Sequence, residues 1–221
     1  LGVRDYQSQG ILPEALKNYF LRLGWAKGDQ EIFDHEHMVK DFVQGNLNQS
    51  PAIFSFDKLL WFNKHYLDSM NEEELMNMID SKDFDGSAYA FSVLQAIRER
   101  CSTLNDFDTY SSYFFHDPQT FEESLVEKHC KKETHGYLSA LQLHLSNMEN
   151  WNQSSIKEII DKTVAELNIG FGKVGLPLRL ALTATVTSPS IDLVCEILGK
   201  ETVQQRLKNF IDVIKPQEKN L

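Results

Sequence analysis

Apolar residues recur every three or four positions along most of this 221-residue chain, and this spacing places them on one face of an α-helix. Alternation at every second residue, which would indicate β-strands, never extends beyond a few residues. The helical spacing therefore predicts an all-α fold, with the helices gathered into an elongated array of small bundles. The expected helices cover residues 12–24, 35–42, 56–67, 71–78, 90–104, 106–115, 118–130, 135–148, 155–170, 189–198 and 203–214.

Local signals indicate where several of these helices begin and end. Pro13 suits the first position of a helix, and Gly24 suits its end. Ser155 and Glu158 have the spacing of a capping box, so a strongly amphipathic helix is expected to begin there. We interpret Gly170 as the left-handed residue that ends this helix. Breaks in the pattern near 70–80 and 148–154 predict three regions, 1–75, 76–150 and 151–221.

The composition is that of an ordinary soluble chain. No apolar stretch approaches the roughly 18 residues of a membrane span, and the first residues lack the pattern of a secretory leader. The three cysteines lie far apart, which favours buried thiols in a reducing compartment over a disulfide or zinc site. A cytoplasmic location is therefore expected.

The net charge of −10 argues against a broad basic surface for nucleic acid. The charge is uneven, however. Between Lys173 and Lys208 there are five lysines and arginines and three carboxylates, so five minus three leaves +2. An acidic chain with such a segment can still read a few nucleotides locally.

Residues 170–175 match the G-x-G-x-x-G spacing of a dinucleotide-binding loop. Such a loop follows a strand and opens a helix, whereas here an expected helix precedes it and no parallel strands are expected. We therefore interpret this stretch as a helix end and a connection.

No group of residues predicts catalysis or a resident metal. Motifs for a serine nucleophile or a phosphate loop do not occur, and the glutamates at 72–74 and 122–123 suit solvated helix N-termini. His35 and His37 have no cysteine or carboxylate pair at a helical ligand spacing beside them.

Three polar features remain. Arg100 precedes Cys101 in the apolar stripe of 90–104, so its side chain is expected at the rim of that buried face. Arg179 is the only charge between Lys173 and Asp192. Ser188-Pro189 would be the N-cap and first residue of the next helix. The simpler alternative is that these are two surface arginines and an ordinary helix cap.

Three stretches resemble the C-terminal half of bacterial glutamyl-tRNA synthetase, in the family's order and at its spacing. The family's two ATP-site motifs, of the His-Ile-Gly-His and Lys-Met-Ser-Lys types, do not occur here. The resemblance implies a fragment that is inactive alone, with ATP and Mg belonging to the parent enzyme and no cofactor in this chain. The stretches are GILPEALKNYFLRLGWAKGDQEIF (10–33), SPAIFSFDKLLWFNKHYL (50–67) and GLPLRLALTATVTSPSIDLVCEILGKE (175–201).

The resemblance also implies a partner, tRNA(Glu), and a role for each region. Residues 1–75 would contact the tRNA stem, while 76–150 and 151–221 would be two anticodon-binding subdomains of a monomer that binds neither DNA nor membrane. Arg100 would contact the third anticodon base, as in members that discriminate against tRNA(Gln). The remaining implied contacts are Lys58 and Trp61 on the stem, and Arg179, Ser188, Pro189 and Ile191 on the anticodon loop.

Two points stay open on the sequence. Trp61 suits core packing as well as RNA contact, because the helix at 56–67 is apolar on two sides. Ala184 stands where members more often have glycine. The alternative function is a helical protein–protein interaction module without an RNA role, which would use the exposed part of the Lys58, Trp61 and His65 face.

Overall fold

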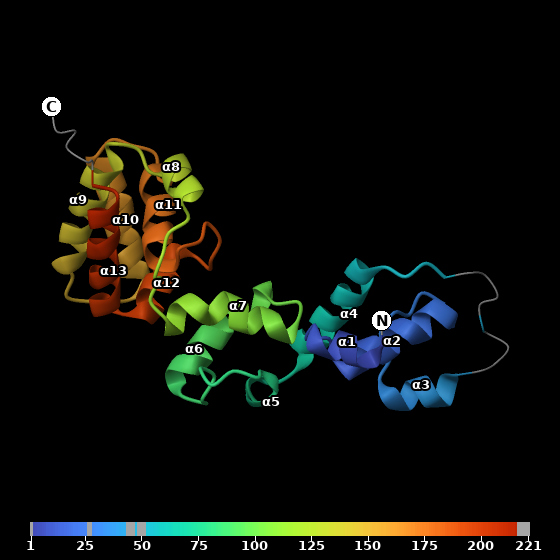
Figure 1. Ribbon diagram of the computed structural model, residues 1–221. Coiled ribbons are helices and arrows are strands. Elements are labelled where there is room, and N and C mark those ends of the chain that lie inside the picture. Colours follow the sequence, from blue (N-terminus) through green and yellow to red (C-terminus); the bar gives the residue numbers. More distant parts are fainter. Residues whose placement is uncertain (1, 26–27, 43–46, 48–51, 216–221) are drawn as a thin grey trace. The chain divides into compact units, whose positions relative to one another are not determined.

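The computed structural model describes residues 2–25, 28–42, 47 and 52–215 (Figure 1). Within these residues the chain is helical, and an isolated bridge between Trp25 and Leu47 is its only β-type pairing. The prediction of an all-α fold is confirmed. The helices are α1 (Val3–Ser8), α2 (Pro13–Gly24), α3 (His35–Asp41), α4 (Phe56–Ser69), α5 (Glu72–Met78), α6 (Ala88–Ile97), the 3-10 turn η2 (Arg98–Arg100), α7 (Leu104–Phe115), α8 (Glu123–His129), α9 (Thr134–Ser146), α10 (Gln153–Glu166), α11 (Gly172–Thr183), α12 (Ile191–Leu198) and α13 (Lys200–Val213).

The chain forms two compact units, residues 1–110 (unit 1) and 111–221 (unit 2). Their boundary falls within α7 and not at the boundaries near 75 and 150 that the sequence suggested. The three regions concern contacts with RNA, and their division stays a prediction. Among the helices of the described part, none is long and apolar enough to cross a membrane.

In unit 1, α2 packs against α4. Helix α2 begins with Pro13 at its first turn, as the sequence predicted, and buries Leu16 and Tyr19. The Tyr19 ring lies 5.9 Å from that of Phe62 on α4, which is fully buried. Burial of these large side chains is the main stabilisation of the pair.

A buried amide joins three segments of unit 1. The Asn63 side chain accepts a hydrogen bond from the Leu12 amide at 2.7 Å and donates to the carbonyls of Ser102 at 2.7 Å and Gly10 at 3.3 Å. Gly10 has a φ of +76°, and a Cβ atom there would lie 2.7 Å from the Asn105 amide nitrogen. Only glycine fits this close approach of backbone to backbone.

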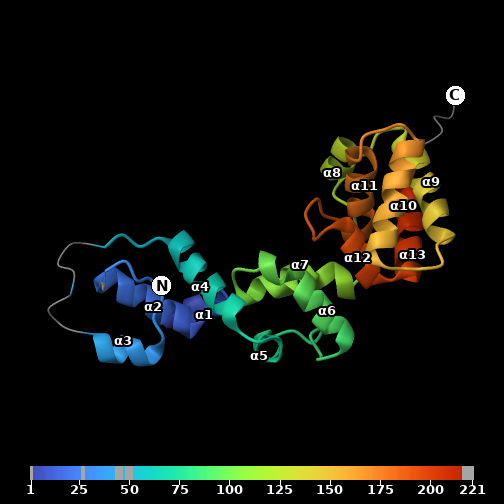
Figure 2. The ribbon, with the colours of Figure 1, turned by 180° about the vertical axis from the view of Figure 1, so that it is seen from behind.

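Unit 2 is a bundle in which α9, α10, α11 and α13 lie side by side, as both views show (Figures 1 and 2). Helix α12 packs against α10, and α8 packs against α11. The bundle buries one apolar stripe from each long helix. The stripes of α10 and α13 were predicted from the sequence, whereas no helix was predicted over α11. Its fully buried side chains include Leu138, Leu141, Leu145, Ile156, Val174, Leu178, Leu182, Val203, Leu207 and Phe210.

A buried arginine, Arg206 on α13, connects the ends of two other helices in this bundle. Its guanidinium donates to the carbonyls of Tyr113 and Leu182, each at 2.7 Å, and to that of His116 at 3.3 Å. Its Nε lies 2.8 Å from Asp117 Oδ1. Arg206 thus satisfies carbonyls near the C-terminal ends of α7 and α11, which lack partners within their own helices.

The stripe at 90–104 does not form the continuous helix that we expected. Helix α6 ends at Ile97, and α7 begins only at Leu104. The carboxylate of Asp106 accepts hydrogen bonds from the Ser102 and Thr103 amides, both at 2.8 Å, and so starts a separate helix. Arg98 meanwhile donates to the Leu67 carbonyl at 2.8 Å, at the end of α4.

Two helix starts also differ from the prediction. Helix α10 begins at Gln153, because Asn152 is its N-cap and accepts from the Ser155 amide at 3.0 Å, so Ser155 is not the cap. Helix α8 begins at Glu123, five residues after Pro118. The bond from Arg206 to Asp117 holds the chain before Pro118 against unit 2.

The glycine-rich stretch is helical where a connection was expected. Asn168, with a φ of +51°, is the left-handed residue after α10, and Gly170 is not. Residues from Gly172 onward form the first turn of α11, where the Phe171 ring covers Gly175. A Cβ atom at Gly175 would lie 2.4 Å from that ring. The glycine therefore serves packing, in agreement with the rejection of a dinucleotide loop. The short helix α1 was not predicted.

Candidate functional site

The loop between α11 and α12 is held by Arg179, whose side chain is partly buried. Its Nη1 donates to the carbonyls of Ser188 at 3.0 Å and Pro189 at 2.7 Å and also bonds the Ser188 hydroxyl. Ser188 and Pro189 are buried, so these bonds are shielded from water. The structure therefore brings together three of the residues that the sequence singled out, and Arg179 is not an ordinary surface arginine.

Ser188 and Pro189 precede the helix instead of starting it, which corrects the prediction. Helix α12 begins at Ile191, with Ser190 in the N-cap position. An N-cap carbonyl accepts the first bond of its helix, but the carbonyls of Ser188 and Pro189 accept from Arg179. Ile191 itself is buried, so its contribution is to anchor the start of α12.

Gln153, the first residue of α10, and Trp151, which precedes this helix, hold the other side of α12. The Gln153 side chain donates to Asp192 Oδ2 at 2.8 Å and to the Ser190 hydroxyl at 3.3 Å. The Trp151 indole donates to the Cys195 carbonyl at 3.0 Å. The sequence analysis did not identify Gln153, because a single glutamine after an N-cap residue carries no distinctive pattern.

The loop begins at a left-handed residue, Ala184, with φ +53° and ψ +15°. Alanine pays a steric cost for this conformation that glycine does not. The turn of the family is therefore formed without its usual glycine. The hydroxyl of Thr183 bonds the Arg179 carbonyl at 2.8 Å and lies 3.2 Å from that of Thr185, which reinforces this turn.

In unit 1, Lys58 and Trp61 on α4 are in direct contact. The Lys58 ammonium lies 4.1 Å from the centroid of the Trp61 ring, and the His65 ring is stacked on the same indole at 6.4 Å. Trp61 is 47% exposed, which excludes the alternative that it is a plain core residue. Lys58 also forms an ion pair with Glu31 at 3.1 Å.

Arg100 is the last residue of η2 and is exposed, next to the fully buried Cys101. The predicted position at the rim of a buried face is thus found, although on a 3-10 turn and not on a continuous helix. The predicted residues therefore lie in two separate places within unit 1 and in one loop of unit 2.

The thiols are unsuited to nucleophilic chemistry. Burial raises the pKa of Cys101 to about 12 and that of Cys130 to about 11. Burial also raises the pKa of Cys195. All three are therefore protonated near neutrality, when only a thiolate would be reactive. The described residues contain no cluster of His, Cys, Asp and Glu that could hold a metal ion.

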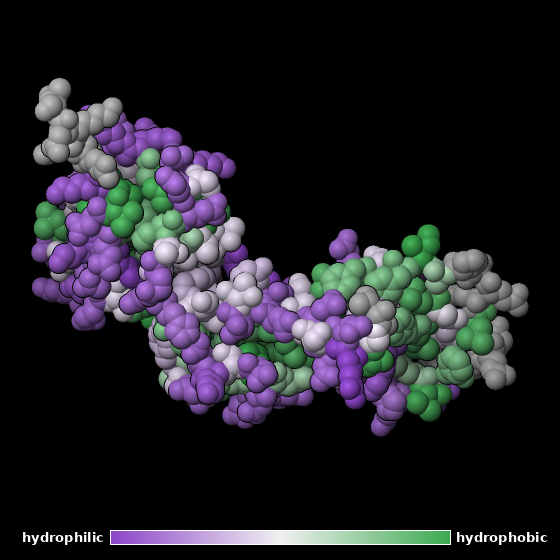
Figure 3. All heavy atoms as spheres, viewed as in Figure 1, coloured by the Kyte–Doolittle hydropathy of each residue, from purple (hydrophilic) through white to green (hydrophobic). Residues whose placement is uncertain are grey.

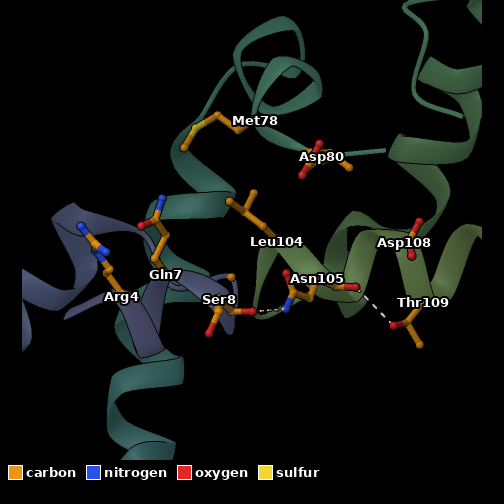
Figure 4. Close-up of a pocket in the computed structure, with 11 residues that line it drawn as sticks. Arg4, Gln7, Ser8, Met78, Asp80, Leu104, Asn105, Asp108 and Thr109 are labelled. Carbon is orange, nitrogen blue, oxygen red and sulfur yellow. Dashed lines mark hydrogen bonds between the residues drawn. The ribbon is translucent and has the colours of Figure 1, made fainter. Parts of the chain in front are cut away.

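A polar pocket of about 710 Å³ lies in unit 1 between α1, the end of α5 and the start of α7 (Figure 4). Arg4 lines it together with Asp80 and Asp108, and Asn105 donates to the Ser8 carbonyl at 2.9 Å. None of the residues predicted for the site lines this pocket.

Known proteins resemble this chain in sequence and in fold. The model of the family described as Anticodon binding domain matches residues 56–211. A crystal structure of a glutamate tRNA ligase from Elizabethkingia meningosepticum, in complex with its amino acid, has 30% identity and a TM-score of 0.85, covering 95% of this chain and 43% of that chain. A glutamate-tRNA synthetase from Elizabethkingia anophelis has 28% identity and a TM-score of 0.80, covering 94% of this chain and 42% of that chain. The chain thus spans less than half the length of these two relatives.

Proposed function

The chain belongs to the anticodon binding domain family, and from this premise we propose that it recognises the anticodon loop and stem of tRNA(Glu) as the C-terminal part of a glutamate–tRNA ligase. The match of the family model over residues 56–211 carries this proposal. Both relatives described above are glutamate–tRNA ligases. The resemblance inferred from three sequence stretches is therefore confirmed.

The loop held by Arg179 is the surface that receives the anticodon in this proposal. RNA sequence is read mainly at unstacked bases in loops, through stacking and hydrogen bonds to base edges. Arg179 fixes the backbone at Ser188 and Pro189, and the buried Ile191 anchors the start of α12. These four residues together shape the surface. Arg100 reads the third anticodon base and disfavours tRNA(Gln).

Unit 1 supplies contacts with the tRNA stem. Lys58 lies on the exposed Trp61 ring, which places a cation and an aromatic surface side by side. Such a pair suits a sugar–phosphate backbone, because the ammonium pairs with phosphate at any sequence. These contacts position the tRNA, and the contacts in the anticodon loop select it.

The chemistry belongs to a catalytic part outside this chain. We propose that the whole enzyme attaches glutamate to tRNA(Glu) with ATP and Mg, in the cytoplasm and as a monomer. In this proposal the chain contributes recognition only. The regions 1–75, 76–150 and 151–221 correspond to the stem-contact region and to the first and second anticodon-binding subdomains.

Binding of labelled tRNA(Glu), followed by fluorescence anisotropy at several salt concentrations, tests the function. We expect affinity to fall as salt rises, because phosphate contacts release counterions. Arg100→Ala should remove about 1–3 kcal/mol of discrimination against a changed third anticodon base. Arg4→Ala, in the polar pocket of unit 1, is the control. Absence of binding to tRNA(Glu) at low salt would exclude the proposal for this chain.

The alternative function, a protein–protein interaction module, has one observation in its favour. Hydrophobic residues gather on the surface of unit 1 over α2 and α4, whereas the visible face of unit 2 is more polar (Figure 3). The exposed members in unit 1 include Phe20, Ile53, Phe54, Phe56 and Trp61. Trp61→Ala with intact tRNA binding but a lost protein partner would support this alternative.

A further inference from the structure

Two cationic side chains of unit 1 converge on the carboxylate of Glu31. Lys58 Nζ on α4 lies 3.1 Å from one carboxylate oxygen, and Arg22 Nη2 on α2 lies 3.6 Å from the other. Glu31 comes from the connection between α2 and α3. Two positive charges thus share one negative charge in an otherwise acidic protein.

Arg22 has more hydrogen-bond donors than its surroundings satisfy. Its Nε and Nη1 are buried and have no hydrogen-bond partner among the residues that the structure describes, and the distance from Nη2 to Glu31 is too long for a hydrogen bond. Buried polar groups in folded proteins are nearly always paired, so an unpaired guanidinium calls for a specific explanation. Within the described residues, the charge of Arg22 is therefore compensated by Glu31 across a distance that leaves room for an anion to approach more closely.

The ion pair with Glu31 is easily exchanged. The side chains of Lys58 and Glu31 are 42% and 36% exposed, and exposed ion pairs contribute little to folding stability. A cation–π contact also holds the Lys58 side chain, because its ammonium lies over the Trp61 ring. The cation therefore keeps its place when the carboxylate moves away.

We propose that Arg22 and Lys58 form a phosphate-binding site, at which Glu31 is the resident anion and a backbone phosphate of the bound RNA replaces it. This inference rests on the proposed function and adds Arg22 and Glu31 to the surface that contacts the stem. A single weakly binding anion competes poorly with Glu31, because the fold already holds this carboxylate next to the two cations. A polyanion competes well, because its binding releases condensed counterions. Glu31 thereby makes the two cations selective for nucleic acid over single small anions.

Removing the charge of Glu31 tests the exchange. Glu31→Gln should bind tRNA(Glu) about threefold more tightly at low salt, since the cations lose their competitor, and the gain should shrink at high salt. Glu73→Gln is the matched control, because Glu73 is an exposed glutamate of unit 1 with no ion pair among the described residues. An equal gain in both variants would overturn the inference.

A double substitution connects the gain to Lys58. In a Lys58→Met background, Glu31→Gln should give a clearly smaller gain, because only Arg22 is then left for Glu31 to neutralise. A gain of undiminished size in this background would refute the exchange. If thermal unfolding shows that Glu31→Gln is destabilised, Glu31→Asp serves instead, since it draws the carboxylate away from Lys58 and should give a smaller gain.

Tripolyphosphate separates this inference from the proposed function. Binding of the polyanion next to Lys58 should shift the NMR signal of the Trp61 indole, and the shift should disappear in Lys58→Met. If the Trp61 signal shifts in this way but the chain does not bind tRNA, the phosphate-binding site is supported and the tRNA function is rejected. No shift in the unsubstituted chain would reject the site even if tRNA binds.

Discussion

The two units each rely on a buried polar side chain that connects backbone from separate segments, but one side chain is neutral and the other is charged. In unit 1 the amide of Asn63 pairs with backbone groups of Gly10, Leu12 and Ser102. In unit 2 the guanidinium of Arg206 pairs with three carbonyls and with Asp117. A neutral amide both donates and accepts, whereas an arginine only donates.

The difference follows from the hydrogen-bonding groups that surround each buried side chain, which we call the joint of that unit. The joint in unit 1 presents one amide N–H and two carbonyls, which a single carboxamide matches. In unit 2 the partners are all acceptors, namely carbonyls at the ends of α7 and α11 and the Asp117 carboxylate, and several donors in one plane suit them better. Arg206 is 95% buried, whereas the Asp117 side chain is 67% exposed, so much of the cost of burying this charge is offset by backbone carbonyls.

Arg206→Met should have the largest effect. Its loss leaves three carbonyls without their donor, so we expect the free energy of unfolding to fall by about 3–5 kcal/mol. Urea denaturation measures the loss, and hydrogen exchange should place it in unit 2. Lys208→Met, an exposed position on the same helix, is the control. A loss below about 1 kcal/mol would mean that the charged joint contributes no more than a typical hydrogen bond.

Asn63→Leu should cost somewhat less, about 2–3 kcal/mol, because the buried Leu12 amide and Ser102 carbonyl lose their partner. Hydrogen exchange should increase in unit 1 and stay unchanged in unit 2. Lys64→Met, at the next and half-buried position of α4, removes only an ion pair with Asp68 and is the control. Faster exchange in both units would show that their stabilities are not separate.

Alkaline pH should weaken both units, because burial raises the pKa of a thiol in each, Cys101 in unit 1 and both Cys130 and Cys195 in unit 2. Burial raises the folded-state pKa of Cys101 from 9.0 to about 12, so above pH 9 the unfolded chain binds fewer protons and stability falls. The slope is at most roughly 1.4 kcal/mol per pH unit for one thiol. Denaturation of Cys101→Ala at pH 8 and pH 10 should show a smaller loss than the unsubstituted chain, and an equal loss would exclude this thiol as the cause.

Ala184→Gly should give the smallest effect and the opposite sign. Glycine adopts the left-handed conformation of this position without strain, so we expect a gain of about 0.5–1 kcal/mol in unit 2. Ala181→Gly, inside the same helix, should instead destabilise by about 1 kcal/mol. Thermal unfolding compares the two, and a loss in both would contradict the assigned backbone conformation.

The sequence predicted the helices best where one face is continuously buried. Leu16 and Tyr19 on α2, and Val203, Leu207 and Phe210 on α13, occupy the expected core positions. Helix ends were predicted less well, because they depend on distant partners. Nothing near Pro189 in the sequence reveals that Arg179 occupies the carbonyls on which the helix was expected to start.

The candidate site was predictable in part. The isolated position of Arg179 among apolar residues and the exposed arginine before Cys101 were visible in the sequence. Arg206 was also detectable in principle, since it lies between Val203 and Phe210 on the buried stripe. Glu31 was not, because its partners Arg22 and Lys58 come from two other segments and only the packing of α2 on α4 brings them together.

The clamp of Arg179 on the loop before α12 has a kinetic consequence for the proposed function. A loop whose carbonyls are already bonded has little conformational freedom to lose when a ligand arrives. Association then does not wait for a slow rearrangement, and its rate is set by how often the partner arrives in the right orientation. Discrimination between partners is therefore expressed in how long each one stays.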